Sequence, residues 1–97
     1  MLLVTKFDFD ADIIDVPLSI LNDIEDYQKL FFKWLFDKTI NHSYWLNKNG
    51  KKYGCSYRSD AFIDWLNENP LKKNREKAKV VSQFITEYNK ALPILCF

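Results

Sequence analysis

Residues 2–16 read LLVTKFDFDADIIDV, and this stretch decides the fold that the sequence predicts. Apolar and acidic side chains alternate along it, which is typical of one half-buried β-strand because successive side chains of a strand point to opposite faces. Pro17 cannot donate a ladder hydrogen bond, so we expect the strand to end near Val16. The pattern puts Phe7, Phe9, Ala11 and Ile13 on the buried face and Asp8, Asp10 and Asp12 on the exposed face.

A helix is predicted directly after this strand. Asn22 followed by Glu25 matches a capping box, and the acidic residues around them suit the positive end of a helix dipole. Apolar side chains then recur at helical spacing as far as about Asp37. This stripe consists of Ile24, Tyr27, Leu30, Phe31, Trp34 and Leu35.

The second half of the chain predicts a hairpin and two further helices. Asn49-Gly50 lies between two aromatic-rich runs and favours a type I′ turn, with strands near 43–47 and 52–57. Ser59 is expected to cap a short helix that Pro70 stops. A last helix is predicted over 78–92, where Ala78, Val81, Phe84, Ile85, Tyr88 and Leu92 share one face. We expect the closing residues ILCF to pack or to pair as a strand.

These elements predict a small single α+β domain over residues 1–97, with an N-terminal strand and a hairpin forming a sheet that packs against about three helices. The composition agrees, because 47% of the residues are hydrophobic and only two are Gly. The N-terminus lacks the features of a signal peptide, and no apolar run approaches a membrane span. We therefore expect a cytoplasmic protein without membrane contact, with Cys55 and Cys96 reduced.

The alternating aspartates raise the question of a metal site. They resemble the start of an EF-hand loop, but Ile13 stands where that loop needs glycine and Ser19 where it needs its closing carboxylate. A Cys55 nucleophile would require His42, the single histidine, as its base. The sequence predicts neither a cofactor, a metal nor enzymatic activity. The aspartates are then either a solvated strand face or a partner surface, which would comprise Asp8, Asp10, Asp12, Asp15, Asp23 and Asp26.

Charge divides the chain into two unlike halves. Residues 1–47 hold eight acidic residues and four lysines, whereas residues 48–97 hold ten basic and five acidic residues. The halves either neutralise each other or form surfaces of opposite potential that steer partners. Cations interleaved with Tyr53 and Tyr57 suit phosphates and bases, so nucleic-acid binding is an alternative function. Its candidate residues are Lys51, Lys52, Arg58, Lys72, Lys73 and Arg75.

Residues 15–35, DVPLSILNDIEDYQKLFFKWL, resemble the N-terminal part of bacterial contact-dependent growth inhibition immunity proteins. The match lies in a V-P-L turn after a short strand, an acidic helix start with D-Y, and a tryptophan within the helix. The residues concerned are Val16, Pro17, Leu18, Asp26, Tyr27 and Trp34. The resemblance implies a protein that binds and neutralises a toxin domain, often a nuclease, in the cytoplasm, and it transfers no contact residue. A small α+β protein of a mobile element is a further alternative.

Overall fold

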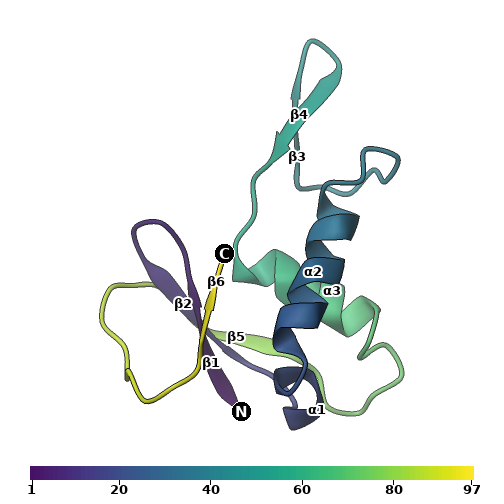
Figure 1. Cartoon of the computed structure of the whole chain (residues 1–97). Coiled ribbons are helices and arrows are strands. Elements are labelled where there is room, and N and C mark those ends of the chain that lie inside the picture. The colour runs from purple at the N-terminus through teal and green to yellow at the C-terminus, as the bar shows by residue number, and fades with distance from the viewer.

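The chain folds into three helices, a four-stranded sheet and a separate two-stranded hairpin, which confirms the α+β class. The computed structural model describes all 97 residues (Figure 1). The strands are β1 (Leu2–Lys6), β2 (Ala11–Asp15), β3 (Trp45–Lys48), β4 (Lys51–Cys55), β5 (Lys79–Ile85) and β6 (Ile94–Cys96). The helices are α1 (Leu18–Leu21), α2 (Ile24–Leu35) and α3 (Ser59–Glu68).

The N-terminal segment forms two strands, so the prediction of a single strand over 2–16 is wrong. β1 and β2 are antiparallel, with Leu2 opposite Asp15 and Lys6 opposite Ala11. The tight loop between them is closed by a hydrogen bond of 2.9 Å from the Phe7 amide to the Asp10 carbonyl. The alternating pattern runs through this loop without a break, because no Gly or Pro marks the turn.

The sheet has the order β5-β2-β1-β6, and both outer strands come from the C-terminal part of the chain. The expected strand at the end of the chain is confirmed as β6, which lies parallel to β1. The helix predicted over 78–92 is wrong, since its first half forms β5, antiparallel to β2. β2 offers β5 backbone partners along its open edge, and the β-branched Val80 and Val81 suit a strand better than a helix. Two register shifts interrupt the pairing of β5 with β2.

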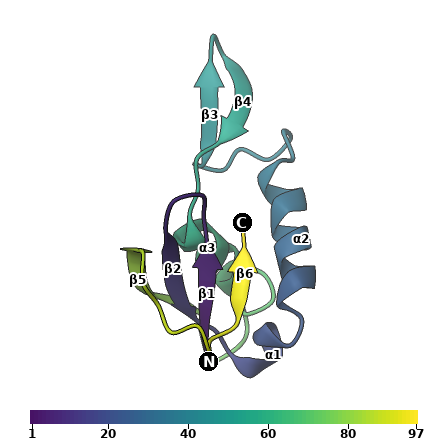
Figure 2. The ribbon, with the colours of Figure 1, turned by 60° about the vertical axis from the view of Figure 1, so that its left-hand side comes forward.

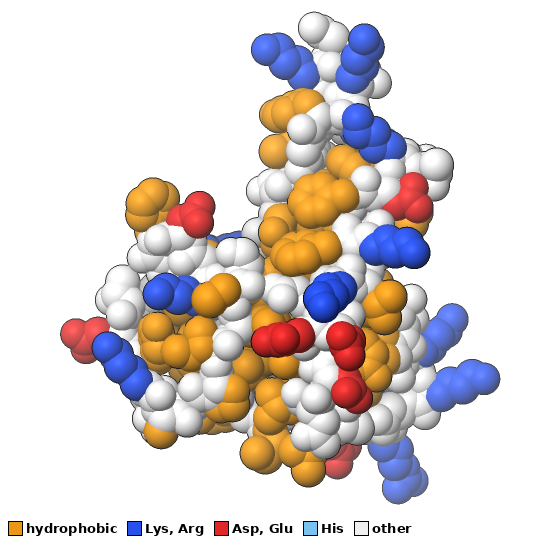
Figure 3. Space-filling model, viewed as in Figure 1, with side chains coloured by type: hydrophobic (Ala, Val, Ile, Leu, Met, Phe, Trp, Pro, Cys, Tyr) orange, Lys and Arg blue, Asp and Glu red, His pale blue; other side chains and the backbone are white.

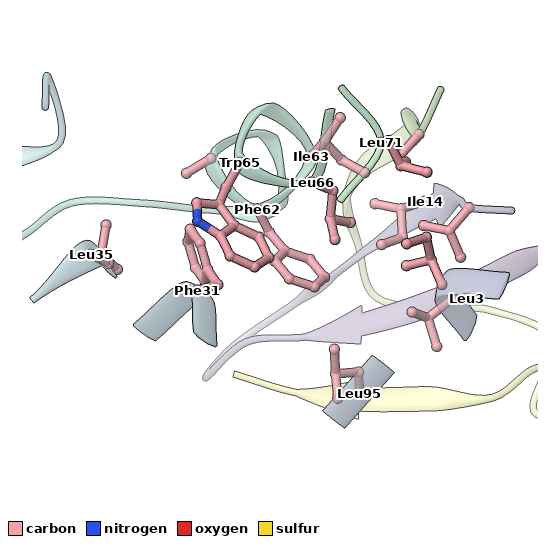
Figure 4. Close-up of a cluster of buried hydrophobic side chains, with 14 residues drawn as sticks. Leu3, Ile14, Phe31, Leu35, Phe62, Ile63, Trp65, Leu66, Leu71 and Leu95 are labelled. Carbon is pink, nitrogen blue, oxygen red and sulfur yellow. The ribbon is translucent and has the colours of Figure 1, made fainter. Parts of the chain in front are cut away.

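α2 and α3 build the core on one side of the sheet (Figure 2). Phe31 of α2 packs edge-on against Phe62 and Trp65 of α3, at 5.2 Å and 6.0 Å between ring centroids. The sheet contributes Leu3, Ile14 and Leu95 to the same cluster (Figure 4). The stripe predicted for α3 is the face that it buries, and the stripe predicted for α2 is buried or partly buried except at Leu30, which is 52% exposed.

The caps of these helices differ from prediction. The Asn22–Glu25 capping box does not form; Asp23 is the N-cap of α2 and makes no side-chain cap hydrogen bond. The N-cap of α3 is Arg58, which moves Ser59 into the first turn and turns its hydroxyl to another partner. α3 ends at Glu68, shortly before Pro70, as expected.

The β3–β4 hairpin projects from the body as an arm (Figures 1 and 2). The predicted Asn49-Gly50 turn is confirmed, since both residues have positive φ values, 54° and 75°. At the root of the arm, the indole of Trp45 donates a 2.6 Å hydrogen bond to the Ile40 carbonyl. The arm therefore departs from the body through an anchored aromatic residue.

Candidate functional site

Asp12 is the centre of the candidate site, and its expected place on the exposed face is wrong. The side chain is fully buried, because Asp12 shares its face of β2 with Ile14, the face that the helices cover. One carboxylate oxygen accepts hydrogen bonds from Arg58 Nη2 at 2.6 Å and from the Phe84 amide at 3.0 Å. The other accepts from the Ser59 hydroxyl and, at 3.4 Å, from Arg58 Nε. Asp12 thus joins β2 to the start of α3 and to β5.

The charges at this centre stabilise each other. Burial by itself would raise the pKa of Asp12, but the hydrogen bonds from Arg58, Ser59 and Phe84 outweigh it and hold the pKa below its ordinary value of 3.8. The hydrogen bond to Asp12 likewise raises the pKa of Arg58. Asp10 adds a second carboxylate, 2.9 Å from Arg58 Nη2. Asp12 and Arg58 are therefore both ionised across the neutral pH range.

Arg58 also lies between two aromatic rings. Its guanidinium carbon is 4.5 Å from the centroid of the Phe7 ring and 4.1 Å from that of Phe84, both within cation–π range. Phe84 adopts a φ of 56°, in the left-handed region that bulky side chains rarely enter. Phe84 lies within the register shift between the Ser82–Ile13 and Ile85–Ala11 pairs of β5 and β2. Its backbone amide donates to the Asp12 carboxylate instead of to a strand partner.

Two phenylalanines on this side of the molecule face solvent. Phe9, at the tip of the β1–β2 loop, is 95% exposed, and Phe84 is 64% exposed. Figure 3 shows hydrophobic and acidic side chains standing together at this tip. We name the surface formed by Asp8, Phe9, Asp10, Arg58 and Phe84 the acidic aromatic face. It contains a hollow of about 340 Å³ between the loop, Tyr57, Arg58 and Phe97.

The remaining predicted partner residues lie elsewhere. Asp15, at the other end of β2, accepts a 2.7 Å hydrogen bond from the amino group of Met1. Asp23 and Asp26 lie exposed at the start of α2. Figure 1 places that end of α2 at the opposite end of the body from the β1–β2 loop. The six aspartates therefore do not form one patch.

The predicted nucleic-acid residues are also dispersed. Lys51 is exposed near the tip of the arm, whereas the Lys52 ammonium donates to the Lys38 carbonyl at 2.6 Å and to Asn41 at 2.5 Å. Arg58 is held by its two carboxylates. The exposed residues Lys72, Lys73 and Arg75 follow α3 at the end of the molecule far from the arm (Figure 1). The structure thus brings these cations to no common surface.

His42 and Cys55 meet at the root of the arm. His42 Nε2 lies 2.7 Å from the Leu35 carbonyl and Nδ1 accepts from the Tyr44 amide, so we assign the proton to Nε2. Cys55 Sγ donates to the same carbonyl at 3.3 Å, and burial raises the pKa of its thiol. A nucleophilic cysteine needs a lowered pKa, so this geometry is that of a structural contact at the end of α2.

Sequence reasoning missed Ser59 and Phe84 as members of the site. The sequence predicts Ser59 as a helix cap, and only the packing of β2 beside the start of α3 shows that its hydroxyl donates to Asp12. Phe84 fits the apolar face of the helix predicted over 78–92, and that wrong prediction gave no reason to expect a positive φ at this residue. Phe9 fitted the buried side of the alternation and is instead exposed, because it lies in the turn.

Comparisons of the chain with protein-family models, with curated proteins and with solved structures find no match. None of the three helices combines the length and the apolar character needed to cross a bilayer. The structure contains no group of three or more His, Cys, Asp or Glu side chains placed to hold a metal ion.

Proposed function

We propose that this chain is a protein-binding domain whose partner is a bacterial toxin domain of the nuclease type, which it neutralises. The acidic aromatic face carries the proposal, above all Phe84. Its backbone is strained while most of its ring faces solvent, so the ring gains little from burial. Backbone strain of this kind costs roughly 1–3 kcal/mol and concentrates at functional positions.

The chemistry of the face suits a basic protein partner. Aromatic and arginine side chains dominate the energetic centres of protein interfaces, and here Phe9, Phe84 and Arg58 lie on one surface. Asp8 and Asp10 surround them with negative charge. A nuclease carries cations to hold its phosphate substrate, and an acidic protein surface can occupy that site instead. The resemblance of residues 15–35 to immunity proteins supports the same function.

Co-expression with the product of the neighbouring gene, as the candidate toxin domain, tests the proposal. We expect the parent chain to restore growth, and the Phe9→Ser/Phe84→Ser variant to lose protection with a Kd weakened by about 30-fold, as for the loss of a 2 kcal/mol interface residue. The matched control is Leu30→Ser/Phe36→Ser, which removes two apolar side chains of the α2 region that are 52% and 50% exposed. Circular dichroism verifies that both variants fold.

Two results would overturn the proposal. One is a parent chain that neither binds this toxin nor protects against it. The other is a Phe9→Ser/Phe84→Ser variant that protects as well as the parent or no worse than the control.

A further inference from the structure

The hollow in the acidic aromatic face has a lining of unusual composition. Four of its seven residues are aromatic, namely Phe7, Phe9, Tyr57 and Phe97, and the others are Asp8, Asp10 and Arg58. Asp8 forms no ion pair and no side-chain hydrogen bond within the chain. Burial, and to a smaller extent the charges of Cys55 and Asp8, raise the pKa of the Tyr57 phenol, which agrees with an acidic group close to this ring.

The formal charge around the hollow is negative. Arg58 supplies one positive charge, and Asp10 and Asp12 both contact it. With Asp8 included, three carboxylates face one guanidinium, and the surplus is not neutralised by any other side chain that lines the hollow. A phosphate or carboxylate ligand would be repelled there, whereas a cation would be attracted.

The wall of the hollow already contains one cation held by rings and carboxylates, the guanidinium of Arg58. Arg58 lies between the Phe7 and Phe84 rings and bonds two carboxylates. Phe9, Tyr57 and Asp8 offer the same two elements, aromatic rings and a carboxylate, on the solvent side. A planar guanidinium can stack on rings and bond a carboxylate with two N–H groups, which an ammonium group cannot do.

We infer that this hollow binds an arginine side chain of the protein partner, with Asp8 as its carboxylate and Phe9 and Tyr57 as its aromatic contacts. The inference rests on the proposed function for the existence of that partner. An arginine that a nuclease uses to hold phosphate would be removed from its substrate when it enters the hollow.

The test is an NMR titration of the isolated chain with N-acetyl-arginine amide, N-acetyl-lysine amide and the neutral N-acetyl-citrulline amide. We expect saturable shifts at residues 7–10, 57 and 97 with the arginine compound, and at least about five-fold weaker binding of the other two. Asp8→Asn should weaken arginine binding by at least about five-fold. The control Asp26→Asn removes another exposed carboxylate, that of α2, and should leave arginine binding unchanged.

The inference is overturned if the shifts do not saturate, if lysine or citrulline binds as well as arginine, or if Asp26→Asn and Asp8→Asn have equal effects. The titration needs no toxin, so its failure is separable from a failure of the proposed function. A chain that neutralises the toxin through Phe9 and Phe84 but does not bind the arginine compound refutes only the assignment of the hollow as an arginine site. A chain that binds arginine but no toxin refutes only the neutralising role.

Discussion

Asp12→Asn tests the assignment of Asp12 as the centre that joins β2, α3 and β5. The carboxylate accepts four hydrogen bonds from three residues, and an amide of the same shape retains one acceptor oxygen. Its NH₂ group would face either Arg58 Nη2 and the Phe84 amide or the Ser59 hydroxyl and Arg58 Nε. Arg58 would also lose its closest counter-charge. Breaking a buried ion pair on one side costs about 3–5 kcal/mol, a large share of the 5–15 kcal/mol typical of a domain.

Urea denaturation at pH 7, followed by circular dichroism, measures this loss. The control is Asp10→Asn, which removes the other carboxylate of Arg58, 2.9 Å away, from a side chain that is 24% exposed. Because solvent weakens that pair, we expect its removal to lower the free energy of unfolding by about 1 kcal/mol or less. If the two variants lose similar stability, the buried position of Asp12 is not what makes it important.

Three further predictions follow from the same structure. Since the pKa of Asp12 is held below 3.8 in the folded chain, its contribution is complete above about pH 5. It is lost as the pH falls through the lowered pKa, so an acid titration of stability should be flatter in Asp12→Asn than in the parent. Phe84→Gly should have a free energy of unfolding about 1 kcal/mol higher than Phe84→Ala in urea denaturation, because glycine accepts a φ of 56° without strain; equal free energies would contradict a strained backbone at Phe84. Trp65→Ala should lower the free energy of unfolding by about 3–5 kcal/mol in thermal melts, and Trp34→Ala by less, since Trp65 is buried and Trp34 only partly buried; the reverse order would show that the core is wrongly placed.

Several elements could be predicted from the sequence because short-range chemistry determines them. The Asn49-Gly50 turn needs two residues that tolerate positive φ, and they are adjacent in the chain. The stripes of α2 and α3 repeat every three or four residues, so Phe31 and Phe62 face the core without reference to distant segments. The apolar residues after Pro93 form β6 as expected.

β5 and the division of the N-terminal segment into β1 and β2 required the tertiary structure. The apolar pattern of Val81, Phe84 and Ile85 fits a helix and also an irregular strand. The strand forms because the open edge of β2 supplies backbone hydrogen-bond partners for this segment. The loop at residues 7–10 continues the alternation of its flanking strands, so only the pairing of β1 with β2 shows where the chain reverses.

The role of the aspartates shows the same limit. Alternation determined that Asp8, Asp10 and Asp12 differ from their neighbours, since side chains of a strand take opposite directions. It does not determine which face another element will cover. That depends on where α3 begins, 47 residues beyond Asp12 in the chain, and there Ser59 and Arg58 bring hydrogen-bond donors onto the carboxylate. The sequence alone thus singled out the aspartates and Arg58 as candidate residues, whereas the tertiary structure decided that Asp12 is internal and that Asp8 has no ion pair within the chain.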